Sequence, residues 1–338
     1  MKRRALVTGI TGMDGSHLAE LLLSEGYEVY GLVRRTSTSN FWRIQHLINE
    51  KKITLIDGDL HDISSIMKSI EASDPELLFH LGANSFVGSS WAQPLAMCQT
   101  TGMGTLNTIE AVRLINPKIR VYIAATSELF GSSVPPQSEN TPFHPRSPYG
   151  VAKLFGFHIC QNYRESYDMF IVNGVLFNHC SPRRGIEFVE RKITDGVARI
   201  KYRLRGELRL GNLDARRDFS ASVDVMEAAY LMLQNDTPTD YVCGSGESHS
   251  IRELCDLAFS HVGLDYRDYV VVDPKFFRQA EVNHLLADPA RIKAELGWKP
   301  KRNFEDLVQE MVDADCERVA RELGRSYELD YSKVPLFV

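Results

Sequence analysis

Tyr149 and Lys153 are four residues apart in the pattern Y-x-x-x-K, and this spacing places a phenol and an ammonium group on one face of a helix. A tyrosine is a poor base at neutral pH, but a neighbouring ammonium and a nicotinium cation favour the phenolate. The pair can then take a proton from a substrate hydroxyl. The pattern alone usually marks a solvated helix face. It becomes a strong indication of catalysis beside Thr126-Ser127-Glu128 upstream.

A glycine-rich turn, Gly9-Ile10-Thr11-Gly12-Met13-Asp14-Gly15, lies between a predicted strand and a predicted helix. Its G-x-x-G-x-x-G spacing lets the backbone approach a pyrophosphate, which then meets the amide groups and the positive dipole end of the helix. This position is what dinucleotide binding requires, although the spacing differs from G-x-G-x-x-G. The alternative is a strand-to-helix turn without a ligand.

The second predicted strand ends in Val33-Arg34-Arg35-Thr36-Ser37. An NAD-preferring site usually has an Asp or Glu there, whereas two guanidiniums and two hydroxyls suit a 2′-phosphate. We therefore expect NADP as the cofactor; the alternative is a solvated basic turn. Asp59 and Leu60 are expected to line the adenine pocket, and the segment from Leu81 to Ser85, which includes Ala83, is expected to pass beneath the dinucleotide.

The elements that must position these residues alternate regularly over the first 130 residues. Buried strands are predicted at 5–8, 28–33, 53–57, 77–81 and 120–125, with a later one at 171–176. Helices are predicted at 16–24 and, after a loop with five prolines at 132–148, at 149–163. Strands separated by helices imply right-handed crossovers. The predicted fold class is α/β, a doubly wound, mostly parallel Rossmann sheet with a second, smaller α/β substrate-binding domain.

The predicted domains are an NADP-binding domain at 1–180, an interleaved nucleotide-sugar-binding domain at 181–320 and a tail of unknown role at 321–338. The chain has 338 residues, of which 43% are hydrophobic and 25% charged, as in ordinary globular proteins. The net charge of −5 argues against non-specific binding to nucleic acid or anionic membranes. The six scattered cysteines indicate neither disulfides nor a metal site. With no signal-peptide pattern and no long apolar run, the expected location is the cytoplasm.

The order of these motifs resembles the extended short-chain dehydrogenases/reductases, and more narrowly the GDP-mannose 4,6-dehydratases. The resemblance runs to about residue 320, and the tail from Gly324 lies outside it. The segments that carry it are 9–35, 125–131, 139–154, 173–192, 210–218 and 295–300.

The resemblance implies a reaction: C4 of the sugar is oxidised, water leaves from C5 and C6, and hydride returns to C6, so that the cofactor is restored. Tyr149 would take the proton of the C4 hydroxyl, Thr126 would hydrogen-bond the same oxygen and Lys153 would hold the cofactor ribose. Glu128 would remove the C5 proton, which the C4 ketone acidifies. The alternative for Glu128 is a carboxylate that caps the loop after a strand.

The resemblance also implies binding residues. Those expected to contact NADP are Gly9, Thr11, Gly12, Met13, Asp14, Gly15, Arg34, Arg35, Asp59, Leu60, Leu81, Ala83, Ser85, Tyr149, Lys153, Leu176, His179 and Arg184. Those expected around the GDP-sugar are Ser85, Thr126, Glu128, Asn178, Lys192, Arg217, Arg278 and Glu281. Arginines suit the diphosphate, although Arg216-Arg217 has a surface pair as its alternative. In this family the 34–40 loop reaches a neighbouring subunit, which implies a homodimer or homotetramer; the alternative is a mobile surface loop.

Four positions depart from the family pattern: Asn84 in place of glutamine, Cys180 in place of glutamate, Phe219 in place of tryptophan and Gln279 in place of proline. Because none of them is a predicted catalytic residue, the reaction type is better supported than the identity of the sugar. The same dehydration of a GDP-manno-heptose is one alternative, and an NADP-dependent GDP-sugar reductase or epimerase is another. A non-catalytic dinucleotide sensor is disfavoured, because all four predicted catalytic side chains are retained.

Overall fold

The computed structural model describes residues 3–324. Within them the chain forms two compact units. The first consists of residues 3–179, 215–249 and 278–302, and the second of residues 180–214, 250–277 and 303–324. A single cut at residue 180 therefore describes only the first of several crossings between the units.

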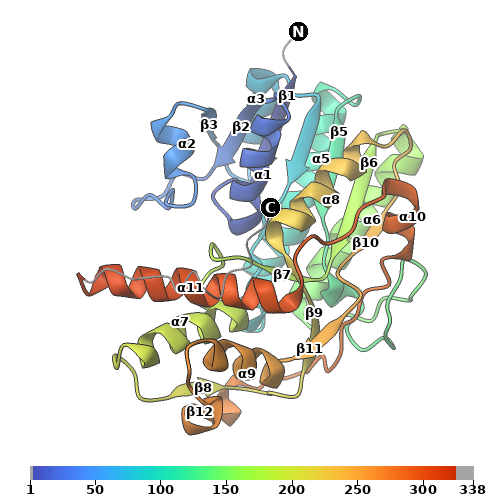
Figure 1. The fold of residues 1–338 in the computed structure, drawn as a ribbon. Coiled ribbons are helices and arrows are strands. Elements are labelled where there is room, and N and C mark those ends of the chain that lie inside the picture. The colour runs from blue at the N-terminus through green and yellow to red at the C-terminus, as the bar shows by residue number, and fades with distance from the viewer. Residues whose placement is uncertain (1–2, 325–338) are drawn as a thin grey trace. The chain divides into compact units, whose positions relative to one another are not determined.

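A seven-stranded sheet forms the centre of the first unit (Figure 1). Its order is β10-β6-β5-β4-β1-β2-β3, and neighbouring strands run parallel. The order reverses between β1 and β4, and in such sheets ligands bind outside the carboxyl ends of the strands at this reversal. The strands are β1 Arg4–Thr8, β2 Glu28–Val33, β3 Ile53–Asp57, β4 Leu77–His80, β5 Arg120–Ala124, β6 Ile171–Leu176 and β10 Tyr241–Cys243.

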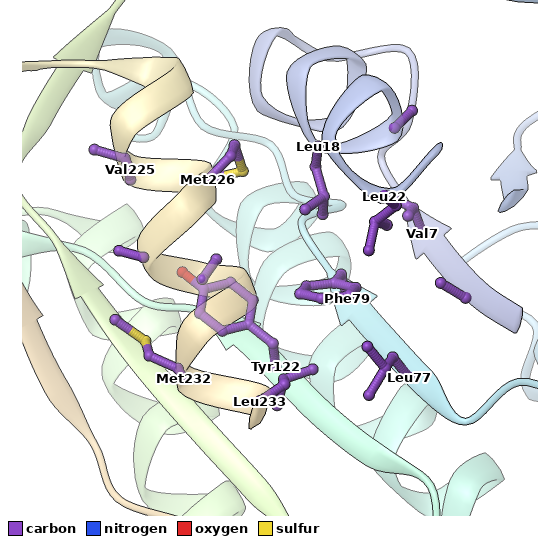
Figure 2. Close-up of a cluster of buried hydrophobic side chains, with 14 of the residues drawn as sticks. Val7, Leu18, Leu22, Leu77, Phe79, Tyr122, Val225, Met226, Met232 and Leu233 are labelled. Atoms are coloured by element: carbon purple, nitrogen blue, oxygen red, sulfur yellow. The ribbon is translucent and has the colours of Figure 1, made fainter. Parts of the chain in front are cut away.

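Helices cover both faces of this sheet because its strands are apolar on both sides. Val7 of β1 packs into one hydrophobic cluster with α1 and α8, which Figure 2 shows around Phe79 and Tyr122. Its neighbour Leu6 points the other way, into a cluster with α3, α5 and α6. The helices of this unit are α1 Met13–Ser24, α2 Gln45–Asn49, α3 Ile63–Ser73, α4 Pro94–Met97, the π-helical turn η2 Cys98–Met103, α5 Gly104–Ile115, α6 Pro148–Tyr167, α8 Ser222–Gln234 and α10 Ala290–Leu296, with the short turns η1 Val87–Ser89 and η3 Ser127–Leu129.

A three-stranded sheet, mostly of residues from the first unit, has the order β11-β9-β7, with β7 Asn178–Cys180, β9 Arg216–Ala221 and β11 Ser248–Ser250. The second unit is mainly helical, and α7 packs against α11. Its α9 begins with a capping box in which Ser250 and Glu253 exchange hydrogen bonds. Its elements are α7 Val189–Lys201, β8 Leu208–Leu210, α9 Ile251–His261, η4 Tyr266–Asp268, β12 Val270–Val272, η5 Pro274–Phe276 and α11 Phe304–Glu322.

The predicted α/β class with a parallel Rossmann sheet is confirmed, and the six strands predicted from the sequence are found within one residue of their expected ends. The first helix begins at Met13 rather than 16, and α6 spans 148–167 rather than 149–163, because apolar periodicity does not mark a helix's first and last turns. Residues 325–338 of the predicted tail lie outside the described residues. Among residues 3–324, no helix has the length and apolar character needed to cross a bilayer.

Candidate active site

The glycine turn at 9–15 is tight enough to exclude side chains at its first and third glycines. Gly9 has φ +75°, and a Cβ there would lie 2.8 Å from the nitrogen of Gly82. A Cβ on Gly15 would lie 2.3 Å from the carbonyl oxygen of Gly9. Gly12 is the N-cap of α1 and makes no side-chain capping bond. The turn therefore brings bare backbone to the start of α1, as a cradle for a phosphate anion requires.

Asp14 follows in the first turn of α1, and its carboxylate is held from two sides. The Ser222 hydroxyl donates to one oxygen at 2.6 Å, and His179 Nε2 lies 2.9 Å from the other. His179 Nδ1 lies 2.8 Å from the Phe177 carbonyl oxygen. The structure thus brings together two residues, Asp14 and His179, that are 165 positions apart in the sequence and were both predicted to contact the cofactor.

The other predicted cofactor residues of the first unit stand after the carboxyl ends of strands. Asp59 and Leu60 follow β3, the segment Leu81, Ala83 and Ser85 follows β4, and Leu176 ends β6. Thr8 joins β1 to β4, because its hydroxyl accepts from the Gly82 amide at 3.1 Å and meets His80 Nδ1 at 3.0 Å. Burial lowers the pKa of His80 to about 3, so this imidazole is neutral.

Arg34 and Arg35 are exposed after β2, where a 2′-phosphate contact was predicted. Arg43 was missed from the sequence. Its guanidinium reaches back to the glycine turn and donates to the Thr11 carbonyl oxygen at 3.3 Å. Its position nine residues after Arg34, within an irregular segment, gave no periodic signal.

Tyr149 and Lys153 lie in the first two turns of α6. The helix begins there because Pro148 occupies its first position and the Ser147 hydroxyl accepts from the Gly150 amide at 3.0 Å. Both side chains are buried, and Tyr149 packs against Val87, Met97 and Trp91. Lys153 Nζ donates to the Ala124 carbonyl oxygen at 2.6 Å, and burial lowers the pKa of Lys153 to about 8.

Thr126 and Glu128 begin the turn after β5. The Thr126 hydroxyl accepts from the Glu128 amide at 3.3 Å, which makes Thr126 the N-cap of η3. Glu128 is buried, and Arg278 donates to its Oε1 at 3.1 Å. Its Oε2 is buried without a hydrogen-bond partner among the described residues.

The backbone of Glu128 also lies close to the start of α6, because a Cβ on Gly150 would be 3.0 Å from the Glu128 carbonyl oxygen. Thr126, Glu128, Tyr149 and Lys153 therefore occupy one neighbourhood, at the end of β5 and the start of α6. These adjacent segments carry a hydroxyl, a carboxylate, a phenol and an ammonium group.

Arg217 and Glu281, both predicted around the substrate, face one another with Arg217 Nη2 3.7 Å from Glu281 Oε1. Arg217 is buried, so an exposed surface pair with Arg216 is excluded. Asn178 lies on β7, next to His179.

Two predicted residues, Arg184 and Lys192, belong to the second unit. The Arg184 guanidinium lies over the Phe188 ring at 3.7 Å, and Lys192 Nζ lies over the Phe276 ring at 3.7 Å. Burial is the main reason why the pKa of Lys192 is lowered, and Arg205 adds to the effect. Both are cations held on aromatic faces.

Comparison with known proteins decides the family. A family model described as GDP-mannose 4,6 dehydratase matches residues 6–311. The chain belongs to this family.

Relatives support the GDP-mannose 4,6-dehydratase assignment over most of the chain, and a solved structure supports the fold. GDP-mannose 4,6 dehydratase 1 of Arabidopsis thaliana is 46% identical and covers 95% of this chain and 92% of its own. The human GDP-mannose 4,6 dehydratase is 45% identical, with 93% and 91% covered. The crystal structure of the UDP-glucose 4-epimerase of Thermus thermophilus in complex with NAD has a TM-score of 0.80 at 26% identity and covers 92% of this chain and 98% of that one.

The four departures from the family pattern fall at buried, partly exposed and exposed positions, and Gln279 is the exposed one. Cys180 ends β7 and is buried, and burial raises the pKa of its thiol well above the usual range. Phe219 is buried within β9. Both replacements are therefore uncharged side chains of the interior, whereas Asn84 is partly exposed in the loop after β4.

Proposed function

We propose that this protein converts GDP-mannose to GDP-4-keto-6-deoxymannose and water. The observation that carries the proposal is the Glu128 carboxylate, which is buried beside Thr126 and the start of α6 with one oxygen unpartnered among the described residues. Burying such an oxygen costs free energy, and groups of this kind gather where a protein performs chemistry. A reductase or an epimerase needs the tyrosine and the lysine but no base for an elimination.

Each of the four predicted catalytic side chains has its own role in proton transfer. Tyr149 Oη takes the proton of the C4 hydroxyl, and Thr126 hydrogen-bonds the same oxygen. The Lys153 ammonium, fixed by the Ala124 carbonyl, favours the phenolate form of Tyr149 on the preceding turn of α6. Glu128 then removes the C5 proton, and water leaves from C6. Arg278 Nη1 lies 3.1 Å from Glu128 Oε1, so a cation stands beside the carboxylate that acts as the base.

The glycine turn and the residues around it fit a nicotinamide dinucleotide. The Cβ positions of Gly9 and Gly15 are closed by backbone, and α1 begins without a side-chain cap, which leaves amides for a pyrophosphate. The chemistry that such a group supplies is reversible hydride transfer, which a redox-neutral dehydration needs at C4 and again at C6. We favour NADP, because Arg34 and Arg35 are exposed at the end of β2 and no acidic residue stands there.

The GDP-sugar would be held by cations and by one acidic residue. Arg217 and Arg278 suit a diphosphate that carries two negative charges, and Glu281 suits the donor edge of guanine; all three belong to the first unit. In the first unit, Arg217 pairs with Glu281 and Arg278 pairs with Glu128. Binding of the diphosphate would therefore draw Arg278 from Glu128 at the moment that the sugar arrives.

We also propose that the protein is a homodimer or homotetramer and acts in the cytoplasm. Leu95 on α4, Met103 on η2, and Val151 and Phe155 on α6 are large apolar side chains exposed by 42–80%. A Cβ on Gly102 of η2 would lie 3.3 Å from the Phe155 ring, so part of this surface is contiguous. No disulfide joins any of the six cysteines, all of which lie within the described residues.

The test is to incubate the protein with NADP⁺ and, in parallel, with GDP-mannose and a GDP-manno-heptose. Mass spectrometry should show loss of one water molecule from GDP-mannose with little net change in absorbance near 340 nm. A steady change in this absorbance without loss of water would instead indicate a reductase. Faster turnover of the heptose would reassign the sugar.

A further inference from the structure

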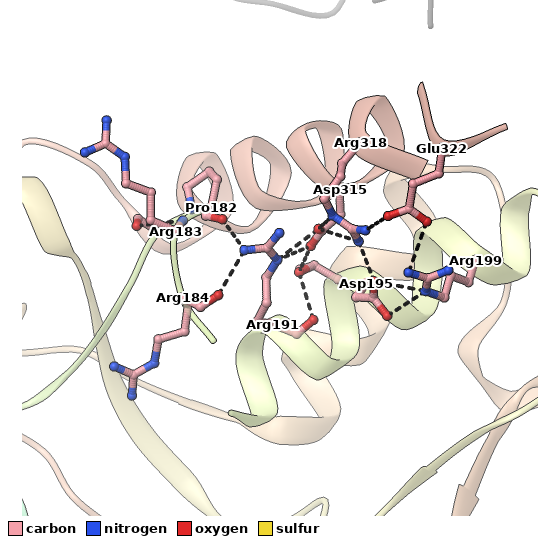
Figure 3. A network of polar contacts seen from close by, with 11 residues as sticks. Pro182, Arg183, Arg184, Arg191, Asp195, Arg199, Asp315, Arg318 and Glu322 are labelled. Carbon is pink, nitrogen blue, oxygen red and sulfur yellow. Dashed lines mark hydrogen bonds and ion pairs between the residues drawn. The ribbon is translucent and has the colours of Figure 1, made fainter. Parts of the chain in front are cut away.

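Arg191 and Asp315 form a buried ion pair inside the second unit, between α7 and α11 (Figure 3). Arg191 Nε lies 2.7 Å from one oxygen of Asp315 and 2.9 Å from the other. The Asp315 side chain is fully buried and that of Arg191 nearly so. Such a pair is costly to form, because both charges lose their water.

Both carboxylate oxygens of Asp315 also accept hydrogen bonds from other side chains. The Thr194 hydroxyl donates to Oδ2 at 2.7 Å, and the Arg318 guanidinium donates to Oδ1 at 3.1 and 3.2 Å. Asp195 and Glu322 continue the network by pairing with Arg318. The carboxylate therefore fixes the orientation of the Arg191 guanidinium.

The Arg191 guanidinium also donates to two main-chain carbonyl oxygens. Its Nη1 donates to the Arg184 carbonyl oxygen at 3.0 Å and also to the Pro182 carbonyl oxygen. Figure 3 shows both carbonyls turned toward Arg191, with the Arg184 side chain directed away from the network. Arg191 thus connects the buried carboxylate to the segment that carries Arg184, which is predicted to contact the cofactor.

The Arg184 guanidinium is held at its other end by the Phe188 ring at 3.7 Å. Its Nε is buried and has no hydrogen-bond partner in the part of the chain that the structure describes. The backbone of Arg184 and the face of its guanidinium are therefore both held in place, and its Nε–H has no acceptor among residues 3–324. A guanidinium held in this way is positioned for an anion before the anion binds.

We propose that Asp315 and Arg191 are positioning residues that fix the backbone at Pro182–Arg184 and thereby place the Arg184 guanidinium for a phosphate group. The inference rests on the proposed function, in which the protein binds NADP, and it takes the phosphate at Arg184 to be one of the phosphates of NADP. Neither Arg191 nor Asp315 is expected to touch the ligand. Their effect on binding passes through Arg184.

The experiment measures the Kd for NADPH and, separately, for GDP, by titration calorimetry on the full chain, with the Tm of each variant. Asp315→Asn should raise the Kd for NADPH by about tenfold, the loss expected when one charge-assisted hydrogen bond is misplaced. The Kd for GDP should stay unchanged. Arg191→Lys keeps a cation for Asp315 but cannot also hold two carbonyls, so it should raise the Kd similarly with a smaller loss of Tm.

Asp195→Asn is the matched control, because Asp195 pairs with Arg318 and Arg199 in the same network but does not contact the 182–184 backbone. It should lower the Tm and leave both Kd values unchanged. If Asp315→Asn does not fold, the Kd for NADPH of Arg191→Lys is compared with that of Asp195→Asn, and this comparison tests the proposal. An increase in the Kd for GDP alone would support positioning and assign the phosphate to the sugar nucleotide.

A double-mutant cycle tests the route through Arg184. In an Arg184→Ala background, Asp315→Asn should have almost no further effect on the Kd for NADPH. Equal effects in both backgrounds would overturn the proposal, as would a lower Tm in Asp315→Asn with unchanged Kd values. A wild-type protein that turns over GDP-mannose while Arg184→Ala binds both ligands normally would remove the inference and leave the proposed function standing.

Discussion

Glu128 in the first unit and Asp315 in the second are both buried carboxylates paired with arginine, yet their surroundings differ. Asp315 has donors on both oxygens, from Arg191, Thr194 and Arg318. Glu128 has one donor, Arg278, on Oε1, and Oε2 has none among residues 3–324.

The difference separates a carboxylate that orders the fold from one that acts on a ligand. A saturated buried ion pair restrains its neighbours, and removing one partner leaves a charge stranded. An incompletely bonded carboxylate contributes little to stability and keeps a lone pair for a proton. Substitutions at the two sites should therefore have opposite profiles in activity and stability.

The largest effect is expected from Glu128→Gln. Dehydration of GDP-mannose should slow by about 10²–10⁴-fold, because general-base help at C5 is lost. The Tm should change little, since the amide has the size of the carboxylate and its partner Arg278 stays partly exposed to water. Product release is followed by mass spectrometry. Glu110→Gln, which alters a glutamate paired with Arg113 on α5, is the control and should leave the rate unchanged. Normal turnover by Glu128→Gln would refute the assigned base.

Asp315→Asn should have the opposite profile. Disrupting its buried pair should lower the free energy of unfolding by about 3 kcal/mol, measured by denaturant titration. Proton transfer at C5 should survive, so kcat at saturating cofactor should fall far less than in Glu128→Gln. Equal stability of the variant and the wild type would show that the network is not structural, and the contrast between the two carboxylates would be lost.

Arg278→Gln tests the arginine that pairs with Glu128. Loss of a charge-assisted contact to substrate should reduce kcat/KM for GDP-mannose by about 10–100-fold. The Tm should hardly change, because the Arg278 side chain is 32% exposed. Arg113→Gln is the matched control, since Arg113 is 31% exposed and also pairs with a glutamate. A fall in Tm without a change in KM would make Arg278 a structural residue instead.

Lys153 extends the comparison to a buried cation. Burial lowers its pKa to about 8, so the ammonium is lost above that pH and kcat/KM should fall about tenfold per unit there. The free energy of unfolding should instead rise as the pH rises above about 8. Because the folded pKa lies below the unfolded one, burying the charged form costs free energy below about pH 8, and this cost fades toward the ordinary lysine pKa. Lys153→Arg keeps its charge, and its residual activity should not decline between pH 8 and 9. A flat wild-type profile up to pH 9.5 would contradict the role of the ammonium.

Local patterns predicted most of the fold, because strand and helix periodicities depend on neighbours in the sequence. The strands at 28–33, 53–57 and 171–176 are found at the predicted residues. The glycine spacing likewise identified the turn at 9–15, since the requirement for glycine arises within that turn. The Arg278–Glu128 and Arg191–Asp315 pairs were not predicted, because they join positions 150 and 124 residues apart.

A signal for the Arg191–Asp315 pair was nevertheless present in the sequence. Within α11, Asp315 falls at helical spacing from Val308, Met311, Val312 and Val319, all of which are buried. A lone charge on the apolar face of a helix predicts a buried partner of opposite sign. It does not say which arginine supplies the partner, and for this the tertiary structure is needed.

The crossings of the chain at 179/180, 214/215, 249/250, 277/278 and 302/303 have a consequence for how such a protein can change over generations. No contiguous stretch of the gene encodes either unit, so an exchange of one DNA segment between relatives cannot transfer either unit whole.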